Sequence, residues 1–252
     1  VVTDAVHSAG GRIYCQLWHV GAISHQVFQP HNARPFSASE FQPEGEAFVG
    51  DLLPEGPTVR HPKAQAMSLE DIDNVKRDYR HAAKCAKGYL LDQFIRSSVN
   101  KRDDQYGGSV ENRLRLLEEV IDVIAQEIPR NNIGVRLSPT GGPGGSFDDD
   151  PQSTYVAAAK AVSGKGVVYL HVVRPNNHTG DGEFTPEEAA KWIENKDTDA
   201  VAFGRLFLSN PDLPARIAQD GPYNEPNEET FYGGGSEGYV DYPSLDDAKS
   251  AK

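Results

Sequence analysis

The order of secondary-structure patterns along the chain predicts an α/β fold with a parallel sheet. Short runs rich in β-branched and aromatic residues alternate with longer stretches in which apolar residues recur at helical spacing. Strands that are joined through helices lie parallel in one sheet. With 252 residues, the chain has the length of one (β/α)8 barrel (TIM barrel) without insertions.

Four segments have the composition of buried strands. Each is brief and follows a turn-prone stretch. They are Ile13–Trp18, Ile133–Leu137, Val167–Val173 and Ala200–Phe203. A complete barrel needs eight strand–helix units of roughly 30 residues each, so we expect the barrel to be incomplete in this chain.

Capping residues mark the helix starts. Ser68 precedes two acidic residues and then apolar residues at helical spacing, which is the form of a capping box. Ser109 precedes a second amphipathic run. Thr185 is followed by proline at the first helical position and by Glu188 three residues after the cap. Asn210 also precedes a proline and predicts the start of a last helix.

The remaining segments are predicted to be loops of one domain over residues 1–252. Residues 24–62 are rich in proline, glycine and glutamate, and we expect an excursion from the barrel rim that could carry a small hairpin. Residues 221–252 form a C-terminal tail rich in glycine and tyrosine. We find no internal repeat and no second domain.

The composition is ordinary for a soluble globular protein, with 38% hydrophobic and 25% charged residues, and its acidity says nothing direct about a substrate. A net charge of -12 and a pI near 5.1 disfavour nonspecific binding to nucleic acid or to an anionic membrane. No apolar run has the length of a membrane span and no signal-peptide pattern opens the chain. The only cysteines, Cys15 and Cys85, have no framework spacing, so we expect two reduced, buried thiols and a cytoplasmic location. Because the first residues already have a helical pattern, we expect a native segment before Val1.

Two predicted strands carry polar side chains on the face that a barrel turns inward. Alternate side chains share a face, so Gln16 and Trp18 lie opposite an apolar face. Gln16 is either a satisfied core amide or a ligand-binding residue. In the second strand, a buried Arg136 would need an anionic ligand or a buried carboxylate. Its place at the strand end, where barrel enzymes have their active sites, favours the ligand.

Two other polar features have simpler interpretations. Gly204 allows backbone amides to approach an anion and Arg205 offers a forked donor for phosphate, but this dipeptide is common. The acidic residues 148–150 are interpreted as a solvated loop rather than a cation site. The spacing of His19 and His25 is not that of a helical metal pair.

Six blocks, in the same order along the chain, resemble the old yellow enzyme family. They are GRIYCQLWHVG (11–21), GYLLDQF (88–94), NKRDDQYGGSVENR (100–113), IGVRLSP (133–139), VAFGRLFLSNPDL (201–213) and FYGGGSEGYVDYP (231–243). The resemblance implies an FMN-dependent ene reductase on a (β/α)8 barrel. Such enzymes are reduced by NAD(P)H and pass hydride to the β-carbon of an activated alkene.

The resemblance also implies where FMN would be held. Gln16 would hydrogen-bond the pyrimidine side of the flavin. Arg136 would lie at the N1–C2 edge, where a positive charge stabilises the anionic reduced ring. Gly204 and Arg205 would hold the FMN phosphate.

The implied catalytic residue is Tyr89, which matches the tyrosine that donates a proton to the α-carbon. Trp18 and Tyr232 match residues that line the substrate pocket. The expected substrates are α,β-unsaturated carbonyl or nitro compounds. We expect no nucleic-acid or membrane partner, and a homo-oligomer is one option.

The chain lacks two segments that the family carries. Members have a strand with a His-x-x-His or His-x-x-Asn pair that grips the substrate's carbonyl oxygen, whereas residues 83–87 lead directly into Gly88 and Tyr89. A helix and strand are also missing between Val173 and Phe184. Without the pair we predict weak or absent enone turnover. The alternative is a flavin-free remnant that acts through protein contacts.

Three explanations of these gaps stay open. The sequence could omit segments that the protein has, or the gene product could have lost exons. The chain could also fold with rearranged strand pairing that a second chain completes.

Overall fold

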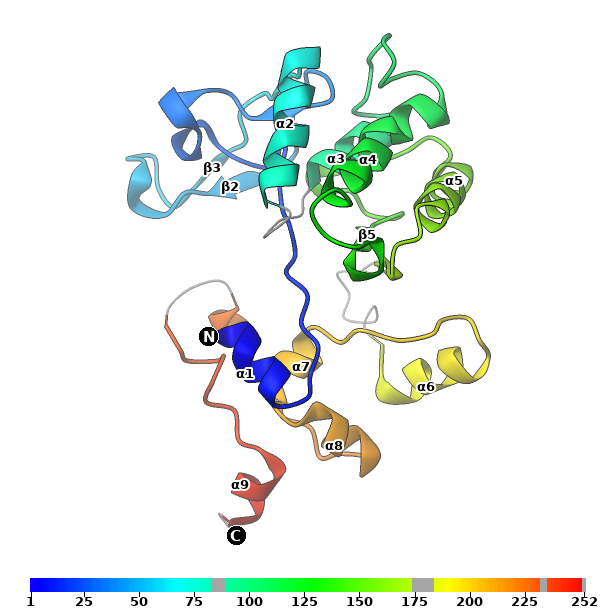
Figure 1. Ribbon diagram of the computed structural model, residues 1–252. Helices are drawn as coiled ribbons and strands as arrows, with labels where there is room; N and C mark the ends of the chain where they lie inside the picture. The colour runs from blue at the N-terminus through cyan, green and yellow to red at the C-terminus, as the bar shows by residue number, and fades with distance from the viewer. Residues whose placement is uncertain (83–88, 174–183, 232–234, 251–252) are drawn as a thin grey trace. The chain divides into compact units, whose positions relative to one another are not determined.

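The computed structural model describes residues 1–82, 89–173, 184–231 and 235–250 (Figure 1). The chain divides into two compact units, Val1–Asn177 and His178–Lys252. The prediction of a single domain over residues 1–252 stays a prediction.

The first unit combines five α-helices and six short strands in its described residues. The helices are α1 (Val2–Ser8), α2 (Leu69–Ala82), α3 (Tyr89–Ile95), α4 (Val110–Ile124) and α5 (Pro151–Gly164). The strands are β1 (Phe36–Ser37), β2 (Glu46–Phe48), β3 (Thr58–Arg60), β4 (Gln65–Ala66), β5 (Gly134–Leu137) and β6 (Tyr169–Val172). The second unit contains α6 (Pro186–Glu194), α7 (Arg205–Ser209), α8 (Leu213–Ala218) and α9 (Leu245–Ser250).

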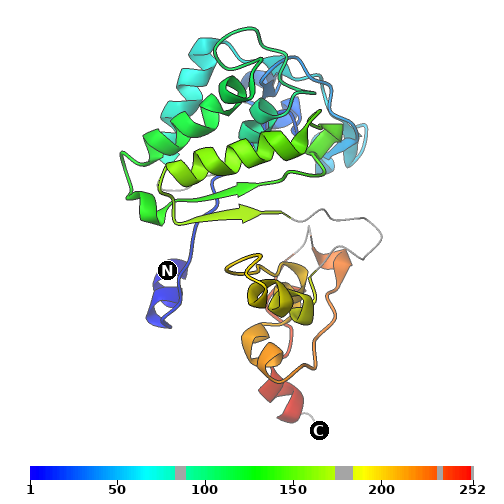
Figure 2. The same cartoon turned by 90° about the vertical axis from the view of Figure 1, so that its right-hand side faces the viewer.

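Strands β5 and β6 form the parallel pair that the sequence predicts. Gly134 lies opposite Tyr169 and Leu137 opposite Val172, with α5 as the crossover between the strands. Helices α4 and α5 lie on one face of this pair (Figure 2). Val135 and Leu137 point into the buried cluster beneath these helices. The prediction of two parallel strands in this region is therefore confirmed, but the expected burial of the second is wrong, because Tyr169 and Val172 of β6 are exposed.

Two other strand predictions are wrong. Ile13–Trp18 and Ala200–Phe203 have no ladder partner among the described residues and are not strands. Their composition suits a strand, but a strand exists only where a neighbouring segment completes its backbone hydrogen bonds.

The rim excursion carries the expected hairpin. Strands β2 and β3 pair antiparallel, with Ala47 opposite Val59. At the base of the excursion, β1 and β4 pair in parallel, and Met67 N donates to the Ser37 carbonyl at 3.0 Å. This second pairing was not predicted, because two-residue strands leave no periodic signal.

Three of the four predicted helix caps are present, each as a hydrogen bond between residues three positions apart. Ser68 and Asp71 bond reciprocally, with Asp71 N donating to Ser68 Oγ at 3.1 Å. Ser109 Oγ accepts from the third residue of α4 at 3.3 Å. Thr185 and Glu188 form a complete capping box at the start of α6.

The prediction that Asn210 caps the last helix is wrong. The side-chain amide of Asn210 donates to the Leu206 carbonyl at 2.8 Å, and its oxygen accepts from Asn224 N at 2.8 Å. Helix α8 instead starts after Asp212. Asn210 is fully buried, so its amide joins two segments rather than capping one.

The tail of the second unit is held by a buried arginine. Arg216 donates to Asp212 at 2.6 Å and to the Pro243 carbonyl at 2.7 Å, and it also bonds the Pro222 carbonyl. With the Arg216 side chain 1% exposed, these contacts satisfy a guanidinium that would be costly to bury unpaired. The predicted tail is thus anchored to α8.

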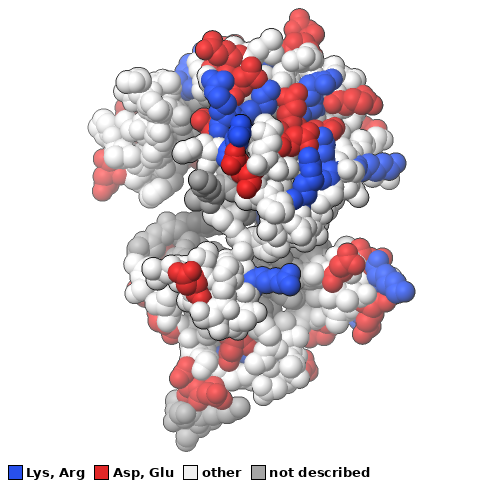
Figure 3. All heavy atoms as spheres, in the orientation of Figure 1, with Lys and Arg blue, Asp and Glu red and all other residues white. Residues whose placement is uncertain are grey.

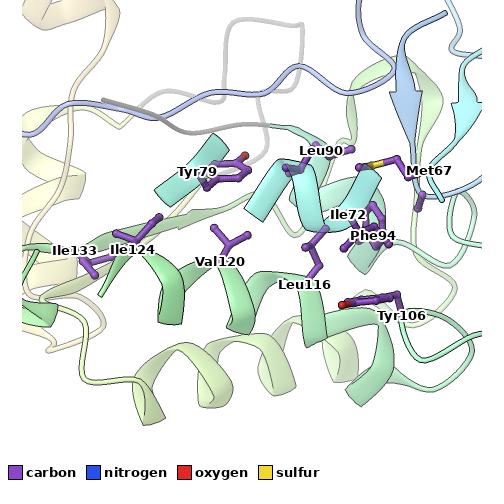
Figure 4. Close-up of a cluster of buried hydrophobic side chains, with 12 residues drawn as sticks. Met67, Ile72, Tyr79, Leu90, Phe94, Tyr106, Leu116, Val120, Ile124 and Ile133 are labelled. Carbon is purple, nitrogen blue, oxygen red and sulfur yellow. The ribbon is translucent and has the colours of Figure 1, made fainter. Parts of the chain in front are cut away.

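The larger apolar core joins α2, α3 and α4. Ile72 and Tyr79 from α2 meet Leu116 and Val120 from α4 (Figure 4). A second cluster lies between α4, α5 and β5. These clusters position β5 and α3, which carry the candidate site.

The surface of the first unit mixes both signs of charge. Lys76 bridges Asp73 at 2.8 Å and Glu119 at 2.9 Å, and Lys165 contacts Asp122 at 2.7 Å. Figure 3 shows positive and negative side chains interspersed over the helices on the face in view. Among the described residues, no helix combines the length and apolarity needed to cross a bilayer.

Candidate flavin and substrate site

A cavity of about 650 Å³ lies in the first unit between residues 12–17, helix α4 and strand β5. Gln16 and Arg136 both line it, although they are far apart in sequence. Tyr14 and Tyr169 also line it, and their rings make an edge-to-face contact with centroids 5.3 Å apart. The structure thus brings together the two residues that the sequence assigned to the flavin ring.

The prediction that Gln16 and Arg136 are buried is wrong. Gln16 and Arg136 are both exposed, so Gln16 is not a satisfied core amide and Arg136 carries no burial penalty. Arg136 forms no ion pair with any described residue. The strand-face argument failed because residues 12–17 are extended but unpaired, which leaves this face open.

Gly134 shapes the floor of the cavity. A Cβ atom at this position would lie 2.1 Å from the Tyr169 ring. The tyrosine can therefore lie flat across β5 only because residue 134 has no side chain.

The predicted substrate residue Trp18 and the predicted proton donor Tyr89 lie side by side. Their rings contact edge to face with centroids 5.2 Å apart. Trp18 is 56% exposed and Tyr89 is half-buried. An aromatic platform beside a phenol is an arrangement suited to an apolar substrate that takes up a proton.

His19 links the segment that carries Trp18 to the start of α3, which carries Tyr89. The sequence had assigned it no role. Its carbonyl accepts from Leu90 N at 2.9 Å and its Nδ1 accepts from Gly21 N at 3.0 Å. Burial lowers the pKa of His19, against smaller raising effects of its backbone hydrogen bond and of Asp78. A neutral ring is required for Nδ1 to accept, so the residue serves as a fixed structural link.

Gln93 makes the second link between the motif and α3. Its Oε1 accepts from Ala22 N at 3.0 Å, and its side chain is buried. Gly21 has φ of 57°, and a Cβ there would lie 2.2 Å from Gln93 Oε1. The glycine of the QLWHVG motif is therefore needed for both conformation and space.

A buried polar network supports the carboxyl end of β5. Arg96 pairs with Asp92 and donates to the carbonyls of Ser138 and Ser146. Asp92 also accepts from the Tyr155 hydroxyl at 2.6 Å. Burial, and then the Asp92 charge, raise the pKa of Tyr155 above its usual range. The only hint in the sequence is the four-residue spacing of Asp92 and Arg96 on one helix face.

The interpretation of residues 148–150 as a solvated loop is wrong for Asp148, whereas Asp149 and Asp150 are exposed. The Asp148 side chain is 1% exposed and pairs with Arg113 at 2.5 Å. Asp149 accepts from Ser97 Oγ at 2.8 Å, and Asp150 caps α5 by accepting from Ser153 N at 3.1 Å. The acidic run therefore ties α4 and α5 to the loop after α3.

The predicted phosphate residues belong to the second unit. Gly204 precedes α7, and Arg205 contacts Glu228 at 2.9 Å and stacks 5.7 Å from the Phe231 ring centroid. Their role in holding phosphate stays a prediction. Tyr232 lies outside the described residues, as does Cys85. Cys15 is exposed and lines the cavity, so its expected burial is wrong.

Comparison with known proteins decides the lineage. The sequence model of the NADH:flavin oxidoreductase / NADH oxidase family matches residues 1–184. The chain belongs to this family. It is therefore an FMN-dependent NAD(P)H oxidoreductase of the ene-reductase type, and the predicted family, enzyme class and cofactors are confirmed.

Relatives of this flavin oxidoreductase match nearly its whole length. It is 34% identical to 12-oxophytodienoate reductase 2 of Arabidopsis thaliana over 283 residues, covering 97% of this chain and 74% of the relative. It is 35% identical to a probable flavin mononucleotide-dependent alkene reductase of Leishmania infantum over 275 residues, covering 97% and 75%. Because both alignments are longer than this chain, the relatives have residues that face gaps in it.

Solved structures confirm the fold class of the flavin oxidoreductase. Morphinone reductase in complex with tetrahydroNAD gives a TM-score of 0.89 at 35% identity, covering 98% of this chain and 76% of that one. The old yellow enzyme homologue from Zymomonas mobilis gives a TM-score of 0.84 at 32% identity, and the match covers 96% of this chain and 76% of the homologue. The fold is a (β/α)8 barrel that is incomplete in this chain.

The described residues fit the ring portion of FMN. Gln16 offers a donor and an acceptor, and Arg136 offers a forked cation, both on one cavity of about 650 Å³. The neighbouring aromatic rings of Tyr14 and Tyr169 give an apolar surface of the kind that a planar ring system contacts.

Proposed function

We propose that this protein reduces the C=C bond of α,β-unsaturated carbonyl or nitro compounds, with NADPH or NADH as reductant. The observation that carries this proposal is that Gln16 and Arg136 line one cavity although they are 120 residues apart in sequence. When bound, FMN supplies the hydride transfer that no side chain can perform.

Arg136 is proposed to bind and stabilise the reduced, anionic flavin ring. It is exposed and forms no ion pair within the described residues, so its charge is available to a ligand. Gln16 is proposed to orient the ring through its amide. Neither side chain is part of the apolar core, so replacing one should affect flavin binding rather than folding.

Tyr89 is proposed to donate the proton from its hydroxyl oxygen to the substrate's α-carbon. Its contact with Trp18 fixes the ring, and the hydrogen bond from Leu90 N to the His19 carbonyl fixes the backbone beside it. Trp18 is proposed to form the apolar wall against which the substrate lies.

Nitroalkenes are proposed to be better substrates than enones. His19, the histidine beside Trp18 and Tyr89, already accepts a hydrogen bond at Nδ1 and is neutral. Its one ring proton then lies on Nε2, and a neutral donor polarises a substrate carbonyl less than an imidazolium does, whereas a nitro group withdraws electrons strongly without help. A cytoplasmic location and a homo-oligomeric state stay predictions.

The first test is the absorbance spectrum of the purified chain before and after it is loaded with excess FMN and desalted. We expect a retained flavin spectrum that bleaches on addition of NADPH. A protein that stays colourless would contradict the proposal and favour the flavin-free remnant.

The Arg136→Ala variant tests the assignment of the flavin site. Loss of a charge-assisted hydrogen bond should weaken FMN binding by about 10- to 100-fold. Arg60→Ala is the matched control, because Arg60 is also exposed but does not line the cavity. Equal FMN affinity in both variants would refute the assignment.

The Tyr89→Phe variant separates the two half-reactions. NADPH should bleach the flavin at the parental rate, while reduction of nitrocyclohexene should fall roughly 100-fold or more. A parental rate of nitroalkene reduction would exclude Tyr89 as the proton donor. Nitrocyclohexene turnover faster than cyclohexenone turnover is expected in the parental protein.

A further inference from the structure

Strand β5 has a free edge inside the cavity. Within the described residues it pairs only with β6. The carbonyls of Ile133 and Leu137 accept from the β6 side. In a parallel ladder the alternate residues direct their backbone groups to the opposite edge, so Gly134 and Arg136 present unpaired N–H and C=O groups there. Just beyond them, Arg96 reaches the Ser138 carbonyl from that same side.

The opposite wall of the cavity is also an unpaired extended segment. Residues 12–17 line the cavity and form no backbone hydrogen bond with another described residue. The cavity therefore has strand-like backbone on two sides, and each side lacks a partner. Unpaired backbone groups of this kind are the template for strand addition.

The side chains around this gap separate by polarity. Towards the helices, the wall is apolar and includes Val120 and Ile124 of α4 together with Val135 of β5. Arg136 points to the other face of β5, and Arg12 is exposed and also lines the cavity. Neither arginine forms an ion pair within the described residues.

Tyr79 adds an unsatisfied polar group to the apolar wall. The residue is 4% exposed and lines the cavity, yet its hydroxyl has no hydrogen-bond partner among the described residues. Figure 4 shows its ring above Val120, with the hydroxyl directed away from α4. A buried hydroxyl without a partner is costly and would gain from an acceptor placed in the cavity.

We propose that this gap binds an extended polypeptide segment of another protein, which adds as a strand between residues 12–17 and the free edge of β5. The segment alternates apolar residues, which face α4, with acidic residues, which face Arg12 and Arg136, so the bound segment and FMN compete for Arg136. A small apolar molecule would leave the backbone groups of Gly134 and Arg136 unpaired, whereas a strand bonds them in register. The segment needs about five residues to span β5, at roughly 3.3 Å per residue.

The test uses the full chain without FMN, so failure of flavin binding and failure of strand addition are separate results. The probe is an acetylated and amidated heptapeptide that alternates valine and glutamate. Binding is followed by fluorescence anisotropy of a labelled copy, and amide hydrogen exchange is measured at saturation. We expect exchange at Gly134 and Arg136 to slow by about tenfold or more.

Two variants make the test specific. Tyr79→Phe should weaken peptide binding roughly fivefold, because one hydrogen bond is lost, and it should not lower the melting temperature. Tyr223→Phe is the matched control, since Tyr223 also has a buried hydroxyl with no partner in the described part of the chain but belongs to the second unit. It should leave peptide affinity unchanged.

Three results would overturn the proposal. One is no binding up to about 1 mM peptide, the limit of a weak association. Another is binding without protection of the two amides. The third is equal affinity for a peptide with lysine in place of glutamate, because the arginines would then play no part.

Discussion

Replacing Asp148 by asparagine should destabilise the first unit strongly although it touches no proposed site residue. The Asp148 carboxylate accepts from Arg113 at 2.5 Å, from Ser97 N at 2.9 Å and from the Thr154 hydroxyl at 2.8 Å. Removing one partner of a buried ion pair costs about 3–5 kcal/mol, because the other charge is left uncompensated. Asparagine retains one acceptor oxygen and Arg113 retains the Ile95 carbonyl, so we expect about 3 kcal/mol.

This loss is large against the total stability of about 5–15 kcal/mol of an ordinary domain. Urea unfolding monitored by circular dichroism measures the free energy of unfolding. Asp149→Asn is the matched control: it is the next residue, is exposed, and its carboxylate accepts from no described residue but Ser97. We expect the control to change stability by less than about 0.5 kcal/mol. Equal effects of the two substitutions would refute the argument from burial.

The same pair predicts how stability depends on pH. Burial raises the pKa of Asp148, but the hydrogen bonds from Arg113, Ser97 and Thr154 outweigh it and lower the pKa from 3.8 to about 2. A lowered carboxyl pKa gives stability that is present above pH 4 and is lost as pH falls towards 2. The contribution is about 1–2 kcal/mol. Asp148→Asn should therefore flatten the pH dependence of unfolding in that window, and an unchanged slope would contradict it.

Three further substitutions test the packing that positions the site. Gly21→Ala should lower the melting temperature and the FMN affinity together, because a Cβ would collide with Gln93 at a φ of 57°. Val120→Ala should cost about 2 kcal/mol in urea unfolding, because Val120 is 2% exposed in the core. Thr185→Ala should cost about 1 kcal/mol through loss of the cap that bonds Glu188 N at 3.2 Å. For Thr185→Ala, we expect faster amide hydrogen exchange in α6 alone, and unchanged exchange there would contradict the role of the cap.

The sequence by itself determined the lineage and three of the four predicted helix starts, and it proposed which residues hold the flavin. Caps such as Ser68 and Thr185 could be predicted because a cap involves residues three positions apart. The motif residues Gln16 and Arg136 were assigned from local sequence blocks, and the structure places both on one cavity. These features depend on neighbours in the chain.

Only the tertiary structure decided which of these residues are buried and which strands are paired. Asp148 lies in an acidic run typical of a solvated loop, but its side chain is buried and pairs with Arg113 of helix α4. Arg136 was expected to be buried, yet it is exposed because no described strand covers the outer edge of β5. Residues 13–18 have the composition of a strand and no partner for it. Burial and strand pairing are set by segments distant in sequence, so local composition cannot determine them.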